Sequence, residues 1–304
     1  MRSRISDRRL AGPAGALVLA LTMALAACGD DGGDNGDGGD DGGTPSASAD
    51  SALADLVPDE IKADGTITVG IDATYPPNES LDTDGETVIG WDVELFDAVA
   101  AQFGLTAEYQ PAPFGNIIPG VQSGQYEVGV SSFTINEERM AEVNMISYFN
   151  AGTQWAAPAG SSVDPDNACG LRVAVQRDTV QVEDIEARSA ACTDAGQPEI
   201  TIEQFQSQEQ ATASVVTGQN DAMLADSPIC AYAVQQTNGQ LELVGEIYDA
   251  APYGYVVAQD QLEFANALQQ AIAAVIADGT YESILSEWGV EGGAITDPAV
   301  NPTG

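Results

Sequence analysis

Histidine is absent from this sequence of 304 residues, and basic residues are few, with 9 Lys and Arg against 47 Asp and Glu. Without histidine the chain can run neither Ser-His-Asp nor Cys-His catalysis. Histidine is also the commonest metal ligand, and the 4 cysteines offer no zinc cluster once they serve other purposes. A formal net charge of −38 makes nucleic acids and anionic lipids poor partners for the surface. We therefore expect no metal site and no nucleic-acid-binding surface.

The N-terminal segment lacks an apolar run long enough to cross a membrane. Ala16–Ala27 is an uncharged stretch of 12 residues, whereas a transmembrane helix needs about 20. Four arginines precede it, a pattern that predicts an export signal over residues 1–27. Its end, LAAC at residues 25–28, resembles the lipobox of bacterial lipoproteins, in which the cysteine is lipidated and becomes the new N-terminus. We expect a lipid anchor on Cys28 at the outer face of the cytoplasmic membrane; a plain secretory peptide is the alternative.

Residues 28–60 are rich in glycine and aspartate, with no large apolar residue before Leu53. Such a segment cannot build a core, so we expect a disordered tether. Beyond the signal, basic residues are scarce enough to be examined one by one; they are Lys62, Arg139, Arg172, Arg177 and Arg188. Arg139 is notable because it closely follows the hydroxyl-rich stretch SSFT at residues 131–134.

The cysteines predict one disulfide. Export permits disulfides, and three cysteines remain once Cys28 is lipidated. Cys169 precedes the apolar stretch LRVAV, and Cys192 follows the helix-like stretch QVEDIEARSAA. A strand followed by a helix that folds back brings these two ends together, so we predict a Cys169–Cys192 bond. Cys230 is then expected to be a buried thiol.

Strand-like and helix-like segments alternate from residue 61 onward, which predicts an α/β fold with mainly parallel sheets. Strands are expected at 66–72, 107–110 and 126–132, with helices at 93–103 and 117–122 between them. The same alternation restarts near residue 169, and extended segments at 147–158 and 251–259 separate the two blocks. We predict two doubly wound sheets joined by a two-strand hinge. Residues 61–155 and 251–304 would form lobe 1, and residues 156–250 would form lobe 2.

Several motifs follow one another in an order that resembles a known family. They include GTITVGIDATYPP, IGWDVELFDAVAAQFG, IIPGVQSGQYEVGVSSFTINEERMAEV, VVTGQNDAMLADS and ADGTYESILSEWG. In this order, from about residue 61 to 290, they are similar to the solute-binding proteins of amino-acid ABC transporters, family 3 of the bacterial extracellular solute-binding proteins. The resemblance implies a two-lobe periplasmic-binding-protein fold of type II. It also implies a monomer without cofactor or catalytic residues, which delivers an amino acid to a permease and its ATPase.

The resemblance further implies a ligand site built from residues that match the family's motifs. They are Asp72, Tyr75, Phe114, Ser131, Ser132, Thr134, Arg139, Thr179 and Asp226. Arg139 would clamp the α-carboxylate of the ligand, because a guanidinium grips both oxygens of a carboxylate. Thr179 and the helix N-terminus that it caps would add donors to the carboxylate. Asp226 would bind the α-ammonium group.

The remaining side chains would surround the rest of the ligand. Ser131, Ser132 and Thr134 would offer backbone and hydroxyl partners to its two ends, and Tyr75 and Phe114 would sandwich its side chain. Considered singly, each of these residues is more often a turn, cap or core residue. It is their joint occurrence in family order that favours a binding site.

The charges predicted for the site favour a ligand with a polar or cationic side chain. The two ends of a zwitterion use one arginine and one aspartate, which leaves Asp72 to face a cationic or amide group; Asp72 could instead order its loop. The family often has phenylalanine where this chain has Asn78. Arg177 could reach the cleft and favour an acidic ligand, or pair with Asp178 at the surface.

Two other functions suit the same scaffold. Some relatives act as dehydratases on prephenate- or arogenate-like acids, and here Asp72 and Glu79 are the candidate general acids. A ligand-sensing receptor is the other alternative, and it would need a separate signalling partner because no transmembrane segment is apparent after residue 61.

Overall fold

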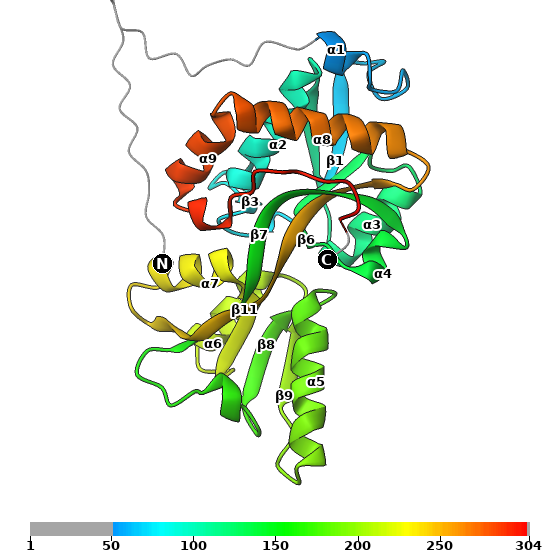
Figure 1. Cartoon of the computed structure of the whole chain (residues 1–304). Helices are drawn as coiled ribbons and strands as arrows, with labels where there is room; N and C mark the ends of the chain where they lie inside the picture. Colours follow the sequence, from blue (N-terminus) through cyan, green and yellow to red (C-terminus); the bar gives the residue numbers. More distant parts are fainter. Residues whose placement is uncertain (1–50, 303–304) are drawn as a thin grey trace, which may run out of the picture. The chain divides into compact units, whose positions relative to one another are not determined.

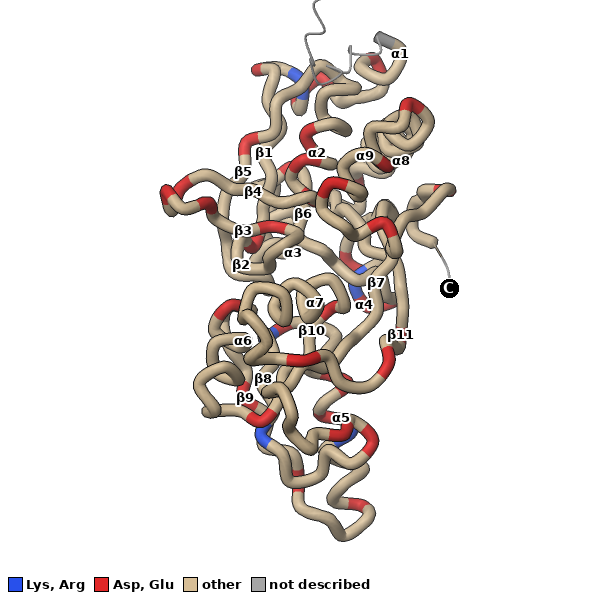
Figure 2. Tube along the Cα trace, turned by 90° about the vertical axis from the view of Figure 1, so that its left-hand side faces the viewer, with Lys and Arg blue, Asp and Glu red and all other residues tan. Residues whose placement is uncertain are grey.

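The computed structural model describes residues 51–302, which lie within one compact unit (Figure 1). The predicted signal, Cys28 and most of the predicted tether lie outside the described residues. Within the described part, no helix has the length and apolar character needed to cross a bilayer. Acidic residues are spread along the whole described chain, and basic residues are few (Figure 2).

An eight-stranded sheet runs through the whole unit in the order β5-β1-β6-β11-β7-β10-β8-β9. Its strands are β1 Thr66–Ile71, β5 Thr106–Pro111, β6 Val128–Thr134, β7 Val143–Pro158, β8 Arg172–Gln176, β9 Thr201–Phe205, β10 Ala222–Asp226 and β11 Leu241–Ala258. β1 pairs in parallel with β5 and β6 at one end, and β8 pairs in parallel with β9 and β10 at the other. We call the part around β1, β5 and β6 lobe 1 and the part around β8, β9 and β10 lobe 2.

Two long antiparallel strands connect the lobes. β7 has 16 residues and β11 has 18, long enough to run through both lobes (Figure 1). β11 pairs with β6 in lobe 1, β7 pairs with β10 in lobe 2, and the two pair with each other along most of their length. The predicted two-strand hinge is therefore present, and it makes the two predicted sheets continuous. β11 begins ten residues before the stretch expected from the sequence.

Helices cover the sheet on both faces. Lobe 1 carries α2 Trp91–Gln102, α3 Phe114–Gln122, α8 Leu262–Ala277 and α9 Thr280–Trp288, with the short helices α1 Ser51–Ala54 and α4 Glu137–Met140. Lobe 2 carries α5 Val180–Asp194, α6 Gln208–Val216 and α7 Ser227–Gln236. The C-terminal helices return to lobe 1, because the apolar stripe of α8, which includes Phe264 and Leu268, packs into one core with α2 and β1. Each such fully buried side chain contributes roughly 1.5–3 kcal/mol.

The loop after β1 forms a small second sheet that brings side chains to the cleft. Its strands are β2 Thr74–Tyr75, β3 Glu79–Leu81 and β4 Val88–Ile89. The chain packs tightly where it enters α2: Gly90 has a φ of 140°, and a Cβ there would lie 2.0 Å from the carbonyl oxygen of Asn78. Only glycine fits this approach. The tight packing holds Asn78 and Glu79 against the end of β6.

The predicted disulfide is confirmed. Cys169 and Cys192 are bonded, with their Cα atoms 5.5 Å apart. They tie the start of lobe 2 to the last turn of α5, and closing a loop of 23 residues stabilises a fold by about 3 kcal/mol in the chain-entropy treatment. Cys230 is a buried free thiol, as expected.

Candidate functional site

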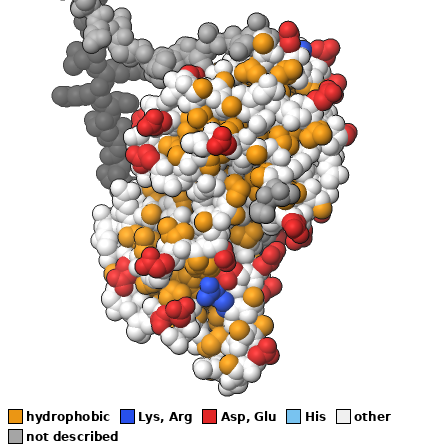
Figure 3. Space-filling model, viewed as in Figure 1, with side chains coloured by type: hydrophobic (Ala, Val, Ile, Leu, Met, Phe, Trp, Pro, Cys, Tyr) orange, Lys and Arg blue, Asp and Glu red, His pale blue; other side chains and the backbone are white. Residues whose placement is uncertain are grey.

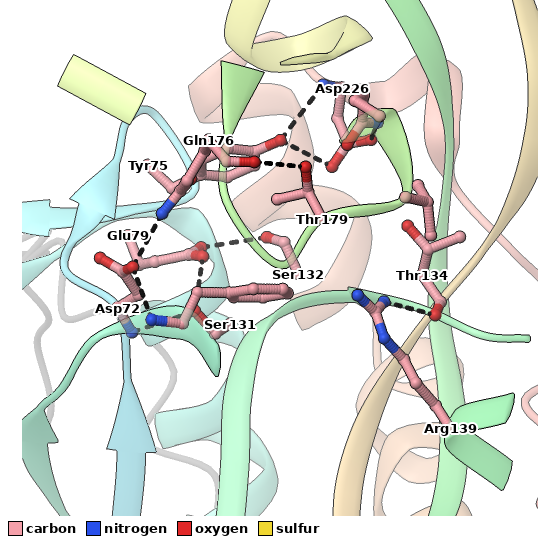
Figure 4. A pocket seen from close by; sticks show the side chains of 13 residues that line it. Asp72, Tyr75, Glu79, Ser131, Ser132, Thr134, Arg139, Gln176, Thr179 and Asp226 are labelled. Carbon is pink, nitrogen blue, oxygen red and sulfur yellow. Dashed lines mark hydrogen bonds between the residues drawn. The ribbon is translucent and has the colours of Figure 1, made fainter. Parts of the chain in front are cut away.

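A narrow cavity lies between the lobes, and all nine predicted ligand residues line it (Figure 4). Four further residues contribute to the lining, namely Glu79, Gln176, Val180 and Gln181. The cavity has a volume of about 290 Å³. The lobes lie close together, since a hydrogen bond from Gln176 to Asp72 crosses the cleft. The site sits beyond the carboxyl ends of β1, β6, β8 and β10, where open α/β sheets bind ligands.

Arg139 extends from α4 toward the cavity and forms no ion pair within residues 51–302. Its Nη1 donates to the carbonyl oxygen of Thr134 at 2.8 Å, and its Nη2 donates across the cleft to that of Asp178 at 3.3 Å. The guanidinium carbon lies 5.3 Å from the centre of the Phe114 ring and 5.6 Å from that of Phe133. Burial lowers the pKa of Arg139, which nevertheless stays charged at neutral pH.

The other basic residues of the described chain behave differently. Three of them form ion pairs, Lys62 with Asp59, Arg172 with Asp221 and Arg188 with Asp184. Arg177 is exposed and is not among the residues that line the cavity, and no ion pair with Asp178 is found among the described residues. The cation of the cavity is therefore Arg139, and its face toward the cleft is available to an anion.

Asp226 is the buried carboxylate that lobe 2 brings to the cavity. It ends β10 and precedes α7, yet its side chain does not cap the helix. Instead Oδ2 accepts a hydrogen bond from the hydroxyl of Tyr75 at 2.9 Å, and Oδ1 accepts one from Nε2 of Gln181 at 2.8 Å. Burial raises the pKa of Asp226, while these hydrogen bonds and Arg139 oppose the shift. Asp226 therefore occupies the N-cap position of α7, but its carboxylate is used for contacts in the cavity and does not cap the helix.

Tyr75 connects the lobes. It comes from β2 of lobe 1, but its ring packs into the apolar cluster of lobe 2 that includes Ala225 and Ile229. Phe114 lies at the other side of the site, where its ring stacks on that of Phe133 with the centres 4.7 Å apart. The two aromatic side chains therefore bound the cavity from different clusters.

Asp72 has two partners in lobe 1 and one in lobe 2. Its Oδ2 accepts from the backbone N–H of Phe114 at 3.0 Å and from Nε2 of Gln176, across the cleft, at 2.8 Å; Oδ1 accepts from the hydroxyl of Thr74 at 2.7 Å. Asp72 thus caps the first turn of α3, which begins at Phe114, three residues before the helix expected there. It orders its loop and lines the cavity at the same time. Burial raises the pKa of its carboxyl.

Thr179 occupies the N-cap position of α5, but its side chain makes no capping hydrogen bond. Its hydroxyl donates to the carbonyl oxygen of Gln176 at 2.7 Å. Thr179 therefore stands at the N-cap position as expected, but its hydroxyl does not supply the capping hydrogen bond. The N–H groups at the start of a helix are suited to hold an anion, and Thr179, Val180 and Gln181 at the start of α5 all line the cavity.

Ser131 and Ser132 lie in the second half of β6 beside Glu79, which is fully buried. The hydroxyl of Ser131 donates to Oε1 of Glu79 at 3.2 Å, and that of Ser132 donates to Oε2 at 3.1 Å. Burial raises the pKa of Glu79 well above its usual range, and the nearby carboxyl of Asp92 adds to the effect. In Figure 4, Asp72, Glu79 and Ser131 lie on one side of the cavity and Arg139 on the other. The cavity therefore has a cationic end and an acidic end.

The sequence model of the bacterial extracellular solute-binding proteins, family 3, matches residues 67–291. The chain belongs to this family. It is 37% identical over 249 residues to a Corynebacterium glutamicum protein named arginine-binding protein ArgT, covering 81% of each chain. The resemblance seen in its motifs is thereby confirmed.

Solved structures agree with this solute-binding fold. An ancestral arginine-binding protein bound to arginine matches with a TM-score of 0.68 and 30% identity, covering 74% of this chain and 98% of that one. An ancestral amino acid-binding protein, described as a precursor of cyclohexadienyl dehydratase, matches with a TM-score of 0.63 and 29% identity, covering 78% and 99%. The predicted two-lobe α/β fold is confirmed.

Three polar residues of the site in this solute-binding protein were missed as lining residues. Gln176 and Gln181 come from lobe 2, and Glu79 was considered only as a general acid. A signal for Glu79 existed, since it follows the TYPPN turn directly and stands where β3 begins. The two glutamines lie on either side of Thr179 in the sequence. They would have been found if the residues a few positions before and after Thr179 had also been considered as ligand residues.

Proposed function

We propose that this solute-binding protein binds an amino acid with a cationic side chain, in the first instance arginine, in the cavity between its lobes. The observation that carries the proposal is that the cavity holds two opposite charges, the guanidinium of Arg139 and the carboxylate of Asp226, and that neither forms an ion pair with another described residue. A zwitterion supplies both missing partners. The names of the relatives, which include arginine-binding proteins, support the same ligand class.

Four of the nine predicted ligand residues, Thr134, Arg139, Thr179 and Asp226, are proposed to serve the α-groups of the ligand. Arg139 clamps the carboxylate with help from the first turn of α5 at Thr179, and Asp226 takes the ammonium. Thr134 holds the Arg139 guanidinium through its carbonyl oxygen. These contacts require the lobes to close on the ligand, which is the hinge motion of periplasmic binding proteins.

The acidic end of the cavity is proposed to hold the guanidinium of the ligand. Asp72 supplies the carboxylate, Ser131 and Ser132 supply further oxygens, and Tyr75 and Phe114 flank the aliphatic part of the side chain. After the α-groups are paired, one positive charge of arginine remains, and the carboxyl groups of Asp72 and Glu79 are the ionisable groups of the lining left for it. A neutral side chain would leave the Asp72 carboxylate without compensation, which is costly in a buried site.

Delivery to the membrane completes the proposal. We propose that Cys28 carries a lipid anchor at the outer face of the cytoplasmic membrane, and that the monomer passes its ligand to an ABC permease and ATPase. Lobe 1 would comprise residues 61–155 and 251–304, and lobe 2 residues 156–250. Acidic side chains are spread over both lobes on the face shown in Figure 3, which disfavours adhesion to an anionic surface and suits a protein held by a tether.

We propose binding without chemical conversion. The buried carboxyl of Glu79, the residue best placed to act as an acid, accepts both serine hydroxyls and is thus occupied as an acceptor. Formation of product from arogenate or prephenate by the purified protein would refute this part of the proposal.

Thermal unfolding with each of the twenty amino acids and ornithine tests the ligand class. A ligand that binds the folded state alone stabilises it by about 2.7 kcal/mol at a hundred times its Kd. Arginine is expected to raise the melting temperature most, followed by ornithine and lysine. Mass spectrometry of material released on denaturation should identify the same amino acid. No stabilisation by any amino acid would refute the proposal.

A further inference from the structure

The hydrogen bonds around Glu79 have a defined direction. The indole Nε1 of Trp91 can only donate, and it donates to Oδ1 of Asn78 at 2.7 Å. This fixes the orientation of the amide, whose Nδ2 donates to the hydroxyl oxygen of Ser132 at 2.8 Å. Ser132 in turn donates its proton to Oε2 of Glu79. The chain of donors therefore starts at an indole and ends at the carboxyl.

A second chain ends on the other oxygen of the same carboxyl. The backbone N–H of Asp72, which can only donate, points to the hydroxyl oxygen of Ser131 at 3.0 Å. Ser131 then donates to Oε1 of Glu79. Each serine hydroxyl has one proton, and both protons are committed to Glu79. Toward the cavity, the hydroxyl oxygen of each serine can therefore only accept a hydrogen bond.

We propose that Glu79 is a positioning residue that sets the selectivity of the cavity for a guanidinium side chain over its uncharged isostere. By taking both serine protons, Glu79 turns two hydroxyls, which could otherwise donate or accept, into acceptors that suit the N–H groups of a cation. When a bound cation keeps Glu79 ionised, its charge adds to that of Asp72. This inference rests on the proposed function, because it presumes an amino acid in the cavity.

The backbone supports a functional role for this arrangement. Ser132 has a φ of 53°, in the left-handed region that non-glycine residues rarely adopt. Such strain persists where surrounding contacts over-determine it and is common at ligand sites. Here Asn78 and Glu79 hold the Ser132 hydroxyl from two sides. No ion pair of Glu79 is found among the described residues, so a cationic group of the ligand would be the first cation that this carboxyl meets.

The inference is tested by measuring the affinities of the Glu79→Gln variant for arginine and for citrulline by titration calorimetry, in comparison with the wild type. Citrulline has the shape of arginine with a carbonyl oxygen in place of one charged nitrogen. The amide of the variant offers one acceptor and one donor, so it can hold only one serine as before. We expect arginine to bind about 10- to 100-fold more weakly and citrulline to change by less than about threefold, since hydrogen bonds to charged groups are the stronger ones.

The matched control is Glu127→Gln, in the same lobe but outside the cavity, where Oε2 accepts from the backbone N–H of Thr68 at 2.7 Å. It should leave both affinities unchanged. If Glu79→Gln weakens arginine and citrulline equally, Glu79 is merely structural and the inference is refuted. If the wild-type protein binds neither ligand nor any other amino acid, the proposed function itself fails.

Ser131→Ala keeps the inference testable should Glu79→Gln not fold. It removes one acceptor lone pair and leaves the carboxyl in place. The expected result is again a larger loss of affinity for arginine than for citrulline. An equal loss for both ligands would overturn the inference.

Discussion

Replacing Arg139 with methionine should abolish ligand binding while the fold survives. The guanidinium is held by two carbonyl oxygens and two aromatic rings, and it forms no ion pair with any residue that the structure describes. A bound carboxylate would thus be its ionic partner, and loss of one member of a buried charged pair costs about 2–5 kcal/mol. This corresponds to an increase in Kd of about 30-fold to about 4,000-fold.

The stability of the ligand-free protein, in contrast to its affinity for the ligand, should not fall in Arg139→Met. Methionine retains an apolar contact with Phe114 and Phe133, and removing an unpaired, desolvated charge is neutral or stabilising. We therefore expect the ligand-free melting temperature of Arg139→Met to equal or exceed that of the wild type. Titration calorimetry with arginine and thermal unfolding measure the two effects separately. A variant that unfolds, or one that binds arginine within threefold of the wild type, would refute the reasoning.

Arg188→Met serves as the matched control. Arg188 pairs with Asp184 at 2.9 Å and donates to the carbonyl oxygen of Pro165 at 3.3 Å, and its guanidinium carbon lies 4.8 Å from the centre of the Tyr248 ring. These contacts belong to lobe 2 and do not reach the cavity. Its loss should lower stability by about 1–2 kcal/mol and leave the Kd for arginine unchanged.

Three further predictions concern pH and the disulfide. Burial raises the pKa of Asp72 and of Glu79 in the free site, and a bound cation would lower both. The affinity for arginine should therefore rise as pH increases above the usual range of carboxyl groups; an affinity independent of pH contradicts this. Burial raises the pKa of Asp92 to about 7, so the protein should lose stability as pH rises toward this value and the buried carboxyl ionises. Asp92→Asn should therefore become more stable than the wild type above about pH 7, and parallel melting curves would contradict it. Reduction of Cys169–Cys192 should destabilise lobe 2 by about 3 kcal/mol, measured by thermal unfolding with and without reductant; an unchanged melting temperature would show that the bond contributes nothing.

Local sequence patterns predicted the elements of the fold and the disulfide. Strands such as β1 and helices such as α2 and α8 follow from apolar spacing, which depends on residues a few positions apart. The Cys169–Cys192 bond also follows locally, because one strand and the helix that returns along it bring its two ends together. The order of the motifs along the chain then indicated the family. It also singled out nine residues that the structure brings into one cavity.

Tertiary structure alone decided how the side chains of that cavity are paired. Asp72 caps α3 and meets Gln176 of the other lobe, and Tyr75 reaches Asp226 across 151 positions of sequence. No local pattern encodes such contacts, because they depend on how β7 and β11 hold the two lobes together. The direction of the hydrogen bonds that end on Glu79 belongs to the same class, since it follows from which donors the fold places behind each serine. The sequence by itself determined which side chains are available to the site, and the closed arrangement of the lobes determined which atoms remain free for a ligand.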